Sequence, residues 1–227
     1  MYSKEKSVVI IDDYPLHIQV YQNILKDIES FDNRWSFKVY EANSGDEALG
    51  LLAEMELASQ PIDLVLLDLN IPHSKRRSHF NGEAIGLEIR SRFAAAKIII
   101  NAESKNNYQI NTILRSIKPE GFLIMTDVDI EVVRSAIIDV LKNIQFFSKS
   151  ALRSLSKSKS HSILLDKWDE KLLYELSLGA KMKDLPEILP FSLAGIEKRK
   201  RNLKLLFGIE GQDNRLLLER AREYGLI

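Results

Sequence analysis

Cysteine is absent from the 227 residues of the chain. Its absence excludes disulfide bonds, thiolate zinc sites and cysteine nucleophiles. Long apolar runs are also lacking, since stretches such as Val8–Ile11 are far shorter than the ~18–20 residues of a membrane span. The N-terminus carries Lys4 and Lys6, but too few apolar residues follow before Asp12 for a secretory signal. We therefore expect a cytoplasmic protein without a membrane partner.

The chain has no net charge, yet its two parts differ in charge. Residues 1–150 carry 17 basic and 21 acidic side chains, a net of −4, whereas residues 151–227 carry 15 and 11, a net of +4. An acidic part joined to a basic part suggests two domains with different partners. The segment 148–162 between them is rich in Ser and Lys and is typical of a linker, although a fraying helix end is an alternative. We predict domains at 1–147 and 163–227, joined by a linker at 148–162.

Short apolar runs alternate with helical patterns in the first of these domains. Five segments have the pattern of strands: Val8–Ile11, the alternating pair Phe37 and Val39, Ile62–Leu67, Ile98–Ile100 and Phe122–Ile124. Apolar residues at helical spacing separate them. Strands that alternate with helices indicate crossover connections and a parallel sheet. The predicted fold class is therefore α/β, with a doubly wound, five-stranded parallel sheet.

Polar residues follow several of these runs where the strands are expected to end. Asp12 and Asp13 follow the first run, Asp68 follows another, and Asn101 and Met125 follow the last two. Functional residues of a parallel sheet cluster at the carboxyl ends of its strands. Three close carboxylates need a compensating cation, and hard oxygen ligands favour Mg²⁺. An aspartate beside the metal can accept a phosphoryl group; the alternative is that these acids only cap nearby helices.

These motifs give residues 7–146 a resemblance to the receiver domain of two-component response regulators. The matching motifs are the pair Asp12-Asp13 and the segment 63–72, which contains Asp68. The resemblance implies that Asp68 is the phosphoacceptor. It also implies that Asp12, Asp13 and Asp68, with the backbone carbonyl of Asn70, hold Mg²⁺.

Three positions depart from or qualify this resemblance. Asn101 stands where the family has Thr or Ser, and its amide is able to donate a hydrogen bond to a phosphoryl oxygen. Met125 stands where the family has Lys and supplies no charge. Phe122 stands where the family keeps an aromatic that rotates on activation, but a plain core residue fits equally well.

An insertion also separates the chain from the family pattern. Gly82 follows the acceptor Asp68 by fourteen residues, where the family has about eight. The extra residues at 73–81 include Lys75, Arg76 and Arg77. These basic residues either fold over the acidic cleft and replace the missing cation, or belong to a solvated loop.

The second domain has the pattern of a helix-turn-helix. A helix over 165–179 and a short one capped by Asp184 precede a third that starts at Ser192 and ends near Phe207. In this third helix Ile196 and Leu203 share an apolar face. Five basic residues lie between positions 197 and 204, so the opposite face is basic and suits the DNA major groove. A solvated charge run is the alternative.

This segment resembles the LuxR-like output domain of response regulators. By position, three side chains would face base edges: Glu197, Lys198 and Arg201. Three others would reach phosphates: Arg199, Asn202 and Lys204. Gly195 and Glu197 depart from the residues usual in that family, so the DNA sequence cannot be inferred from it.

Together the two resemblances imply a homodimeric transcription factor rather than an enzyme. A partner histidine kinase would phosphorylate Asp68 with Mg²⁺, and the receiver would then control binding of the output domain to double-stranded DNA. The first alternative is a receiver-like transcription factor that dimerisation or another ligand controls without phosphorylation. Two others are a Mg²⁺-dependent phosphohydrolase, disfavoured because Asn70 replaces its second acid or base, and an adaptor whose basic helix binds an acidic protein.

Overall fold

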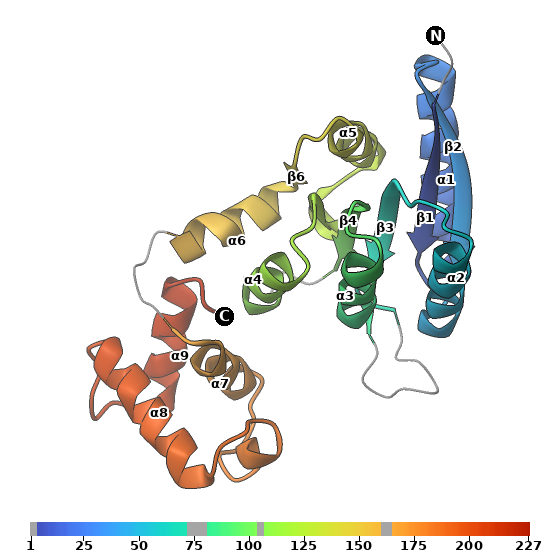
Figure 1. The fold of residues 1–227 in the computed structure, drawn as a ribbon. Coiled ribbons are helices and arrows are strands. Elements are labelled where there is room, and N and C mark those ends of the chain that lie inside the picture. The colour runs from blue at the N-terminus through green and yellow to red at the C-terminus, as the bar shows by residue number, and fades with distance from the viewer. Residues whose placement is uncertain (1–3, 72–80, 104–106, 160–164) are drawn as a thin grey trace. The chain divides into compact units, whose positions relative to one another are not determined.

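The structure is a computed structural model that describes residues 4–71, 81–103, 107–159 and 165–227. Its elements group into two compact units (Figure 1). One unit is formed by residues 1–104 with 113–151, and the other by residues 105–112 with 152–227. The domain boundaries expected from the sequence stay a prediction, and each unit is described below by itself.

The first unit contains a parallel sheet in the order β2-β1-β3-β4-β5-β6. Its strands are β1 (Lys4–Ile11), β2 (Trp35–Ala42), β3 (Leu64–Asp68), β4 (Lys97–Ala102), β5 (Gly121–Ile124) and β6 (Phe146–Phe147). The predicted parallel α/β sheet is confirmed, but its strand count of five is wrong. The sixth strand has two residues and pairs Phe146 with Gly121 and Phe147 with Phe122, so it is too short to show as an apolar run.

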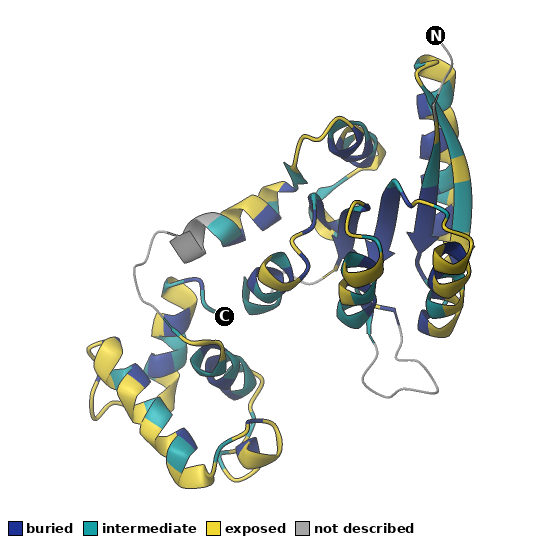
Figure 2. Ribbon diagram, in the orientation of Figure 1, coloured by how far each residue is buried: buried dark blue, intermediate teal, exposed yellow. Residues whose placement is uncertain are grey.

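Alternate strand residues face opposite sides of this sheet, and each side is covered by helices. On one side, Val8, Ile10 and Leu66 pack with α1 (Pro15–Phe31) and α5 (Ile130–Leu141). The other helices of the sheet region are α2 (Gly45–Leu57), α3 (Gly82–Arg92) and α4 (Asn107–Ser116). The central strands are almost completely buried, as Figure 2 shows. Burial on both sides explains why these strands are continuous apolar runs in the sequence.

Local signals in the sequence set the starts of several helices. Pro15 occupies the first turn of α1, where its missing N–H costs nothing. Ser44 caps α2 by accepting a hydrogen bond from the backbone N–H of Glu47. Asn81 caps α3 in the same way, with the N–H of Ala84 as donor.

The predicted linker region contains a helix, α6 (Lys149–Lys159). The Ser148 hydroxyl accepts a hydrogen bond from the backbone N–H of Ile124, and Asp127 accepts one from the N–H of Ser150. Ala151 is fully buried. The start of α6 is therefore tied to the end of β5, although the composition of the segment alone suggests little burial.

The helices of the C-terminal region are α7 (Lys167–Ser177), α8 (Leu193–Leu206) and α9 (Asn214–Glu223), with a 3₁₀ turn, η2 (Leu185–Glu187), between α7 and α8. Their apolar faces form one core of buried side chains: Leu172, Leu173, Leu176, Leu185, Leu189, Ile196, Leu203, Phe207, Ile209, Leu217 and Ala221. The predicted helix-turn-helix pattern is thus present. The short helix expected after Asp184 is a 3₁₀ turn instead, and the Asp184 side chain caps nothing among the described residues. None of the helices in the described ranges combines the length and apolar content needed to cross a lipid bilayer.

Candidate functional site

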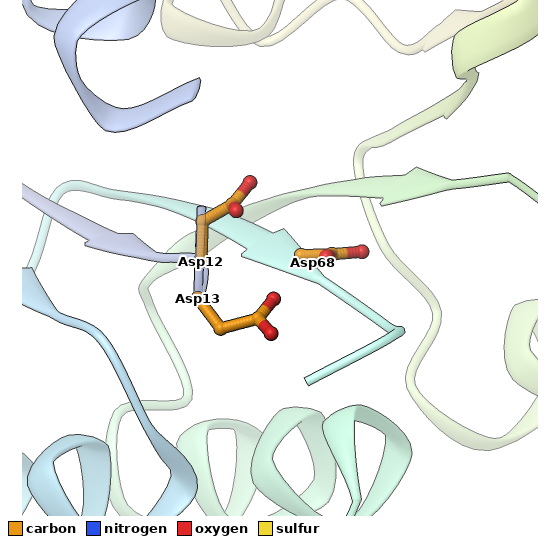
Figure 3. Close-up of side chains that lie close together, drawn as sticks. All are labelled: Asp12, Asp13 and Asp68. Atoms are coloured by element: carbon orange, nitrogen blue, oxygen red, sulfur yellow. The ribbon is translucent and has the colours of Figure 1, made fainter. Parts of the chain in front are cut away.

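Three carboxylates meet at the carboxyl edge of the sheet. Asp12 and Asp13 follow β1, and Asp68 ends β3, its neighbour in the sheet. Each offers one oxygen, and these three oxygens lie within 4.8 Å of one another. Figure 3 shows the three side chains close together at this edge. The strand order reverses beside β1, where parallel sheets form their binding crevices, so the predicted convergence is found.

Two of these carboxylates are held in place by local hydrogen bonds. Asp12 accepts one from the backbone N–H of Tyr14 at 2.9 Å, and its oxygens lie 3.1 and 3.2 Å from Nδ1 of His17. Asp68 accepts one from the backbone N–H of Asn70 at 3.0 Å. These bonds fix the direction of each carboxylate before any ligand binds.

The site carries more negative charge than its surroundings compensate. Burial raises the pKa of Asp12. Burial, and to a lesser degree the charges of Asp12 and Asp13, raise the pKa of Asp68 to about 6. Among the described residues that line the cleft, none is Lys or Arg. A cation bound between the carboxylates would relieve both the burial and the repulsion.

Several buried polar atoms of the cleft have no hydrogen-bond partner among the residues that the structure describes. These atoms are Oδ1 of Asp13, the hydroxyl of Tyr21, and both amide atoms of Asn101. Leaving a buried polar atom unpaired costs roughly 1–3 kcal/mol, so such atoms mark places where an ion, water or ligand binds. Clustered carboxylate oxygens beside further polar atoms fit a hydrated, hard divalent cation such as Mg²⁺.

The cleft has a volume of about 180 Å³, and four of its lining residues were not identified from the sequence. They are Tyr14, His17, Tyr21 and Glu103. Three of them lie at helical spacing at the start of α1, which places them on one face of that helix. This spacing was visible in the sequence, but it does not distinguish a residue of the core from one that reaches the cleft.

Asn101, Met125 and Phe122 differ in their surroundings. Asn101 pairs with Asp68 across β3 and β4, is 2% exposed and lines the cleft. Met125 also lines the cleft, where its thioether supplies no charge. Phe122 is fully buried and is the largest side chain at full burial. Burial is compatible with both roles, so the switching role of Phe122 stays a prediction.

Gly82 lets helix α3 start directly against the end of β3. A Cβ atom at this position would lie 2.5 Å from Cα of Leu69 and 2.6 Å from the carbonyl oxygen of Asp68. Only glycine fits at such distances from backbone atoms. Lys75, Arg76 and Arg77, proposed from the sequence to cover the cleft, lie outside the described residues.

Helix α8 presents one apolar and one polar face, as the sequence predicts. Ile196 and Leu203 are buried in the core of the helix-turn-helix, and Ser192 caps the helix at the N–H of Gly195. Four of the residues predicted to contact DNA are exposed: Glu197, Lys198, Arg201 and Asn202. Their exposure is the condition for contact with a partner, and the contacts themselves stay predictions.

The other two predicted phosphate contacts are engaged within the domain. Arg199 lies 2.8 Å from carboxylate oxygens of both Asp166 and Asp169, and its guanidinium lies 4.4 Å from the ring centroid of Phe191. Lys204 donates a hydrogen bond to the carbonyl oxygen of Gln212. This geometry favours a structural role for Arg199 over the expected phosphate contact. The sequence did not reveal the partners of Arg199, because Asp166 caps α7 and Asp169 lies in its first turn, 33 and 30 positions away.

Solved structures of similar fold include DNA complexes of response regulators. A structure of two RcsB dimers bound to two parallel DNAs has a TM-score of 0.61 at 19% identity, covering 97% of this chain and 99% of that one. RcsB from Salmonella enterica serovar Typhimurium, bound to promoter P1flhDC with the phosphomimetic BeF3⁻, gives 0.63 at 18% identity, covering 97% and 99%. The isolated REC domain of RcsB with BeF3⁻ gives 0.53 at 20% identity, covering 66% and 99%. No protein-family model and no curated protein sequence matches the chain. The likeness shows that the chain has the fold of these two-domain response regulators.

Proposed function

We propose that this chain is a DNA-binding response regulator, a transcription factor controlled by phosphorylation of Asp68. The observation that carries the proposal is the meeting of Asp12, Asp13 and Asp68 within 4.8 Å at the edge of a receiver-type sheet. The same chain continues into a helix-turn-helix, and the RcsB structures of similar fold are bound to DNA. Its partners would be a histidine kinase, double-stranded DNA and a second copy of itself. The protein would act in the cytoplasm, and its role would be regulation rather than catalysis.

The acidic cluster would hold Mg²⁺ through Asp12, Asp13 and Asp68, with the backbone carbonyl of Asn70. When bound, this ion supplies positive charge for the carboxylates and for the oxygens of an incoming phosphoryl group. The raised pKa of Asp68 reflects the burial and repulsion that such a charge would offset.

Asp68 is suited to accept the phosphoryl group. A carboxylate oxygen would attack the phosphorus of a kinase phosphohistidine, the P–N bond would break, and the imidazole would leave with the bonding electrons and take up a proton. The N–H of Asn70 holds Oδ1 of Asp68 and fixes the rotation of the carboxylate. The buried amide of Asn101, next to Asp68 in the sheet, is positioned to donate a hydrogen bond to the transferred group.

Phosphorylation would shift the receiver between two packings and so control the output domain. A single helix-turn-helix reads one half-site, so a dimer is expected on DNA. The exposed side of α8 would face the bases with Glu197, Lys198 and Arg201. Asn202 would contact a phosphate. A glutamate there would accept a hydrogen bond from cytosine N4.

The test uses the full chain, acetyl phosphate and Mg²⁺, with Asp68→Asn as the matched control. We expect intact-mass spectrometry to show one added phosphoryl group on the wild type and none on D68N. DNA duplexes that bind the full chain are then selected from a random pool. The affinity of the wild type and of D68N for these duplexes is compared at several salt concentrations. Control through Asp68 would be refuted if the wild type took up no phosphoryl group and its DNA affinity did not change with beryllofluoride.

The chemistry of the cleft also favours a second candidate function. Met125 and Asn101 leave the site without the lysine and hydroxyl of typical receivers. A transcription factor of the same fold, controlled by dimerisation or another ligand, would accommodate these changes. DNA affinity distinguishes this second function from the first. It would depend on the protein concentration or on the other ligand, and it would be the same in D68N as in the wild type.

A further inference from the structure

Tyr21 lines the acidic cleft, and its hydroxyl is buried. Tyr21 is 2% exposed, and its ring packs in the core between α1, α5 and the sheet. Its hydroxyl has no hydrogen-bond partner among residues 4–71, 81–103, 107–159 and 165–227. A buried tyrosine hydroxyl normally has such a partner, so this group is placed for something that binds in the cleft.

The nearest carboxylates are already held by other donors. Asp12 accepts from the N–H of Tyr14 and lies within hydrogen-bond distance of His17, while Asp68 accepts from the N–H of Asn70. Burial, followed by the charges of Asp12 and Asp68, raises the pKa of Tyr21, so the hydroxyl keeps its proton. The Tyr21 hydroxyl is therefore able to donate a hydrogen bond, and neither Asp12 nor Asp68 accepts one from it.

The cleft offers few other donors to an anion. Met125 contributes a thioether, and the described lining residues include neither Lys nor Arg. Asn101 is 2% exposed, and its amide also lacks a partner within the described part of the chain. An anion on Asp68 would consequently meet neutral donors on those walls of the cleft that the structure describes.

We propose that the Tyr21 hydroxyl donates a hydrogen bond to a tetrahedral anion on Asp68, beside the Asn101 amide, and partly replaces the cation that Met125 does not supply. The anion is the phosphoryl group, or beryllofluoride in its place. This inference rests on the proposed phosphorylation of Asp68. It assigns to α1 a part in recognising the phosphoryl group.

Tyr21→Phe tests the proposal because it removes the hydroxyl and keeps the buried ring. Tyr40→Phe is the matched control, since it removes a hydroxyl from the same unit, at a residue of β2 that is not among the described residues lining the cleft. Beryllofluoride is titrated into each full-length variant in excess Mg²⁺ by isothermal calorimetry, and Mg²⁺ alone is titrated separately. We expect Y21F to weaken beryllofluoride binding about tenfold, the loss typical of one hydrogen bond to a charged group, with Mg²⁺ affinity unchanged. Y40F should stay within about twofold of the wild type, well below that loss.

A second measurement does not depend on how well the variant folds. In the wild type, nuclear magnetic resonance should show a coupling between the Tyr21 hydroxyl proton and bound fluoride. Unchanged beryllofluoride affinity in Y21F, or equal loss in Y40F, would overturn the inference and leave the proposed function intact. If Y21F weakened the binding of Mg²⁺ alone by the same factor, Tyr21 would instead position the carboxylates, and the inference would be wrong. A wild type that binds no beryllofluoride would overturn the inference together with the proposed function.

Discussion

The negative charge of Asp68 lowers the stability of the metal-free protein, and its removal should raise that stability. Asp68 is 7% exposed, and its pKa rises from an ordinary value of 3.8 to about 6 in the folded state. A difference of about 2 pKa units corresponds to about 3 kcal/mol of unfolding free energy. Asp68→Asn removes this charge and keeps an oxygen for the N–H of Asn70.

The sign of the pH dependence follows from the raised pKa. The folded protein binds the Asp68 proton more tightly than the unfolded chain does, so acid favours folding at this site. The penalty of about 3 kcal/mol is complete above pH 6, about half at pH 5, and absent below 3.8. D68N should therefore exceed the wild type in unfolding free energy by up to this amount at pH 7.5 in EDTA, and by less at pH 5.

Urea unfolding followed by tryptophan fluorescence measures this difference. The chain has two tryptophans, and Trp168→Phe leaves Trp35, which lies on β2 of the first unit, as the reporter. Glu54→Gln, at an exposed acid on α2, is the matched control and should change stability by less than about 0.5 kcal/mol. Mg²⁺ at a hundred times its Kd should add about 2.7 kcal/mol to the wild type and less to D68N. A D68N protein that is no more stable in EDTA, or a gain that does not shrink with acid, would refute the reasoning.

Three other predictions concern individual side chains. Gly82→Ala should lower the unfolding free energy by about 1–3 kcal/mol, because its methyl group would lie 2.5 Å from a backbone atom. Gly50→Ala, with open space around it inside α2, should raise the unfolding free energy by up to about 1 kcal/mol. Urea unfolding compares the two variants. Arg199→Gln should lower the unfolding free energy of the helix-turn-helix by about 1–2 kcal/mol through its lost ion pairs, while Arg201→Gln, at an exposed position expected to face a base, should keep stability, weaken DNA binding by about 1–3 kcal/mol and relax specificity at that base pair. Equal effects of these two variants would contradict the separate roles. Tyr21→Phe should unfold at the same or slightly higher urea concentration, because its hydroxyl is paired with no described residue; a clear loss of stability would show that it has a protein partner.

The sequence by itself located the acidic site because local patterns determine where buried strands end. Asp12, Asp13 and Asp68 each follow a run of apolar residues, and parallel strands bring such positions to one edge of the sheet. The apolar and polar faces of α8 followed from helical spacing for the same reason.

Other features depended on contacts between segments that are far apart in the chain. The strand β6 is defined by its pairing with β5, and the helix α6 is tied to the end of β5 through Ser148. The ion pairs of Arg199 with Asp166 and Asp169 likewise came only from the fold, and its predicted DNA contact stays a prediction.

The role of Tyr21 shows the physical reason most clearly. At helical spacing with Ile18 and Ile24, it has the same pattern as a core residue, and its ring does lie in the core. A periodic pattern gives the side of the helix on which a residue lies, but not where the last atom of its side chain ends. Only the packing of α1 against the sheet decided that Tyr21 lines the acidic cleft.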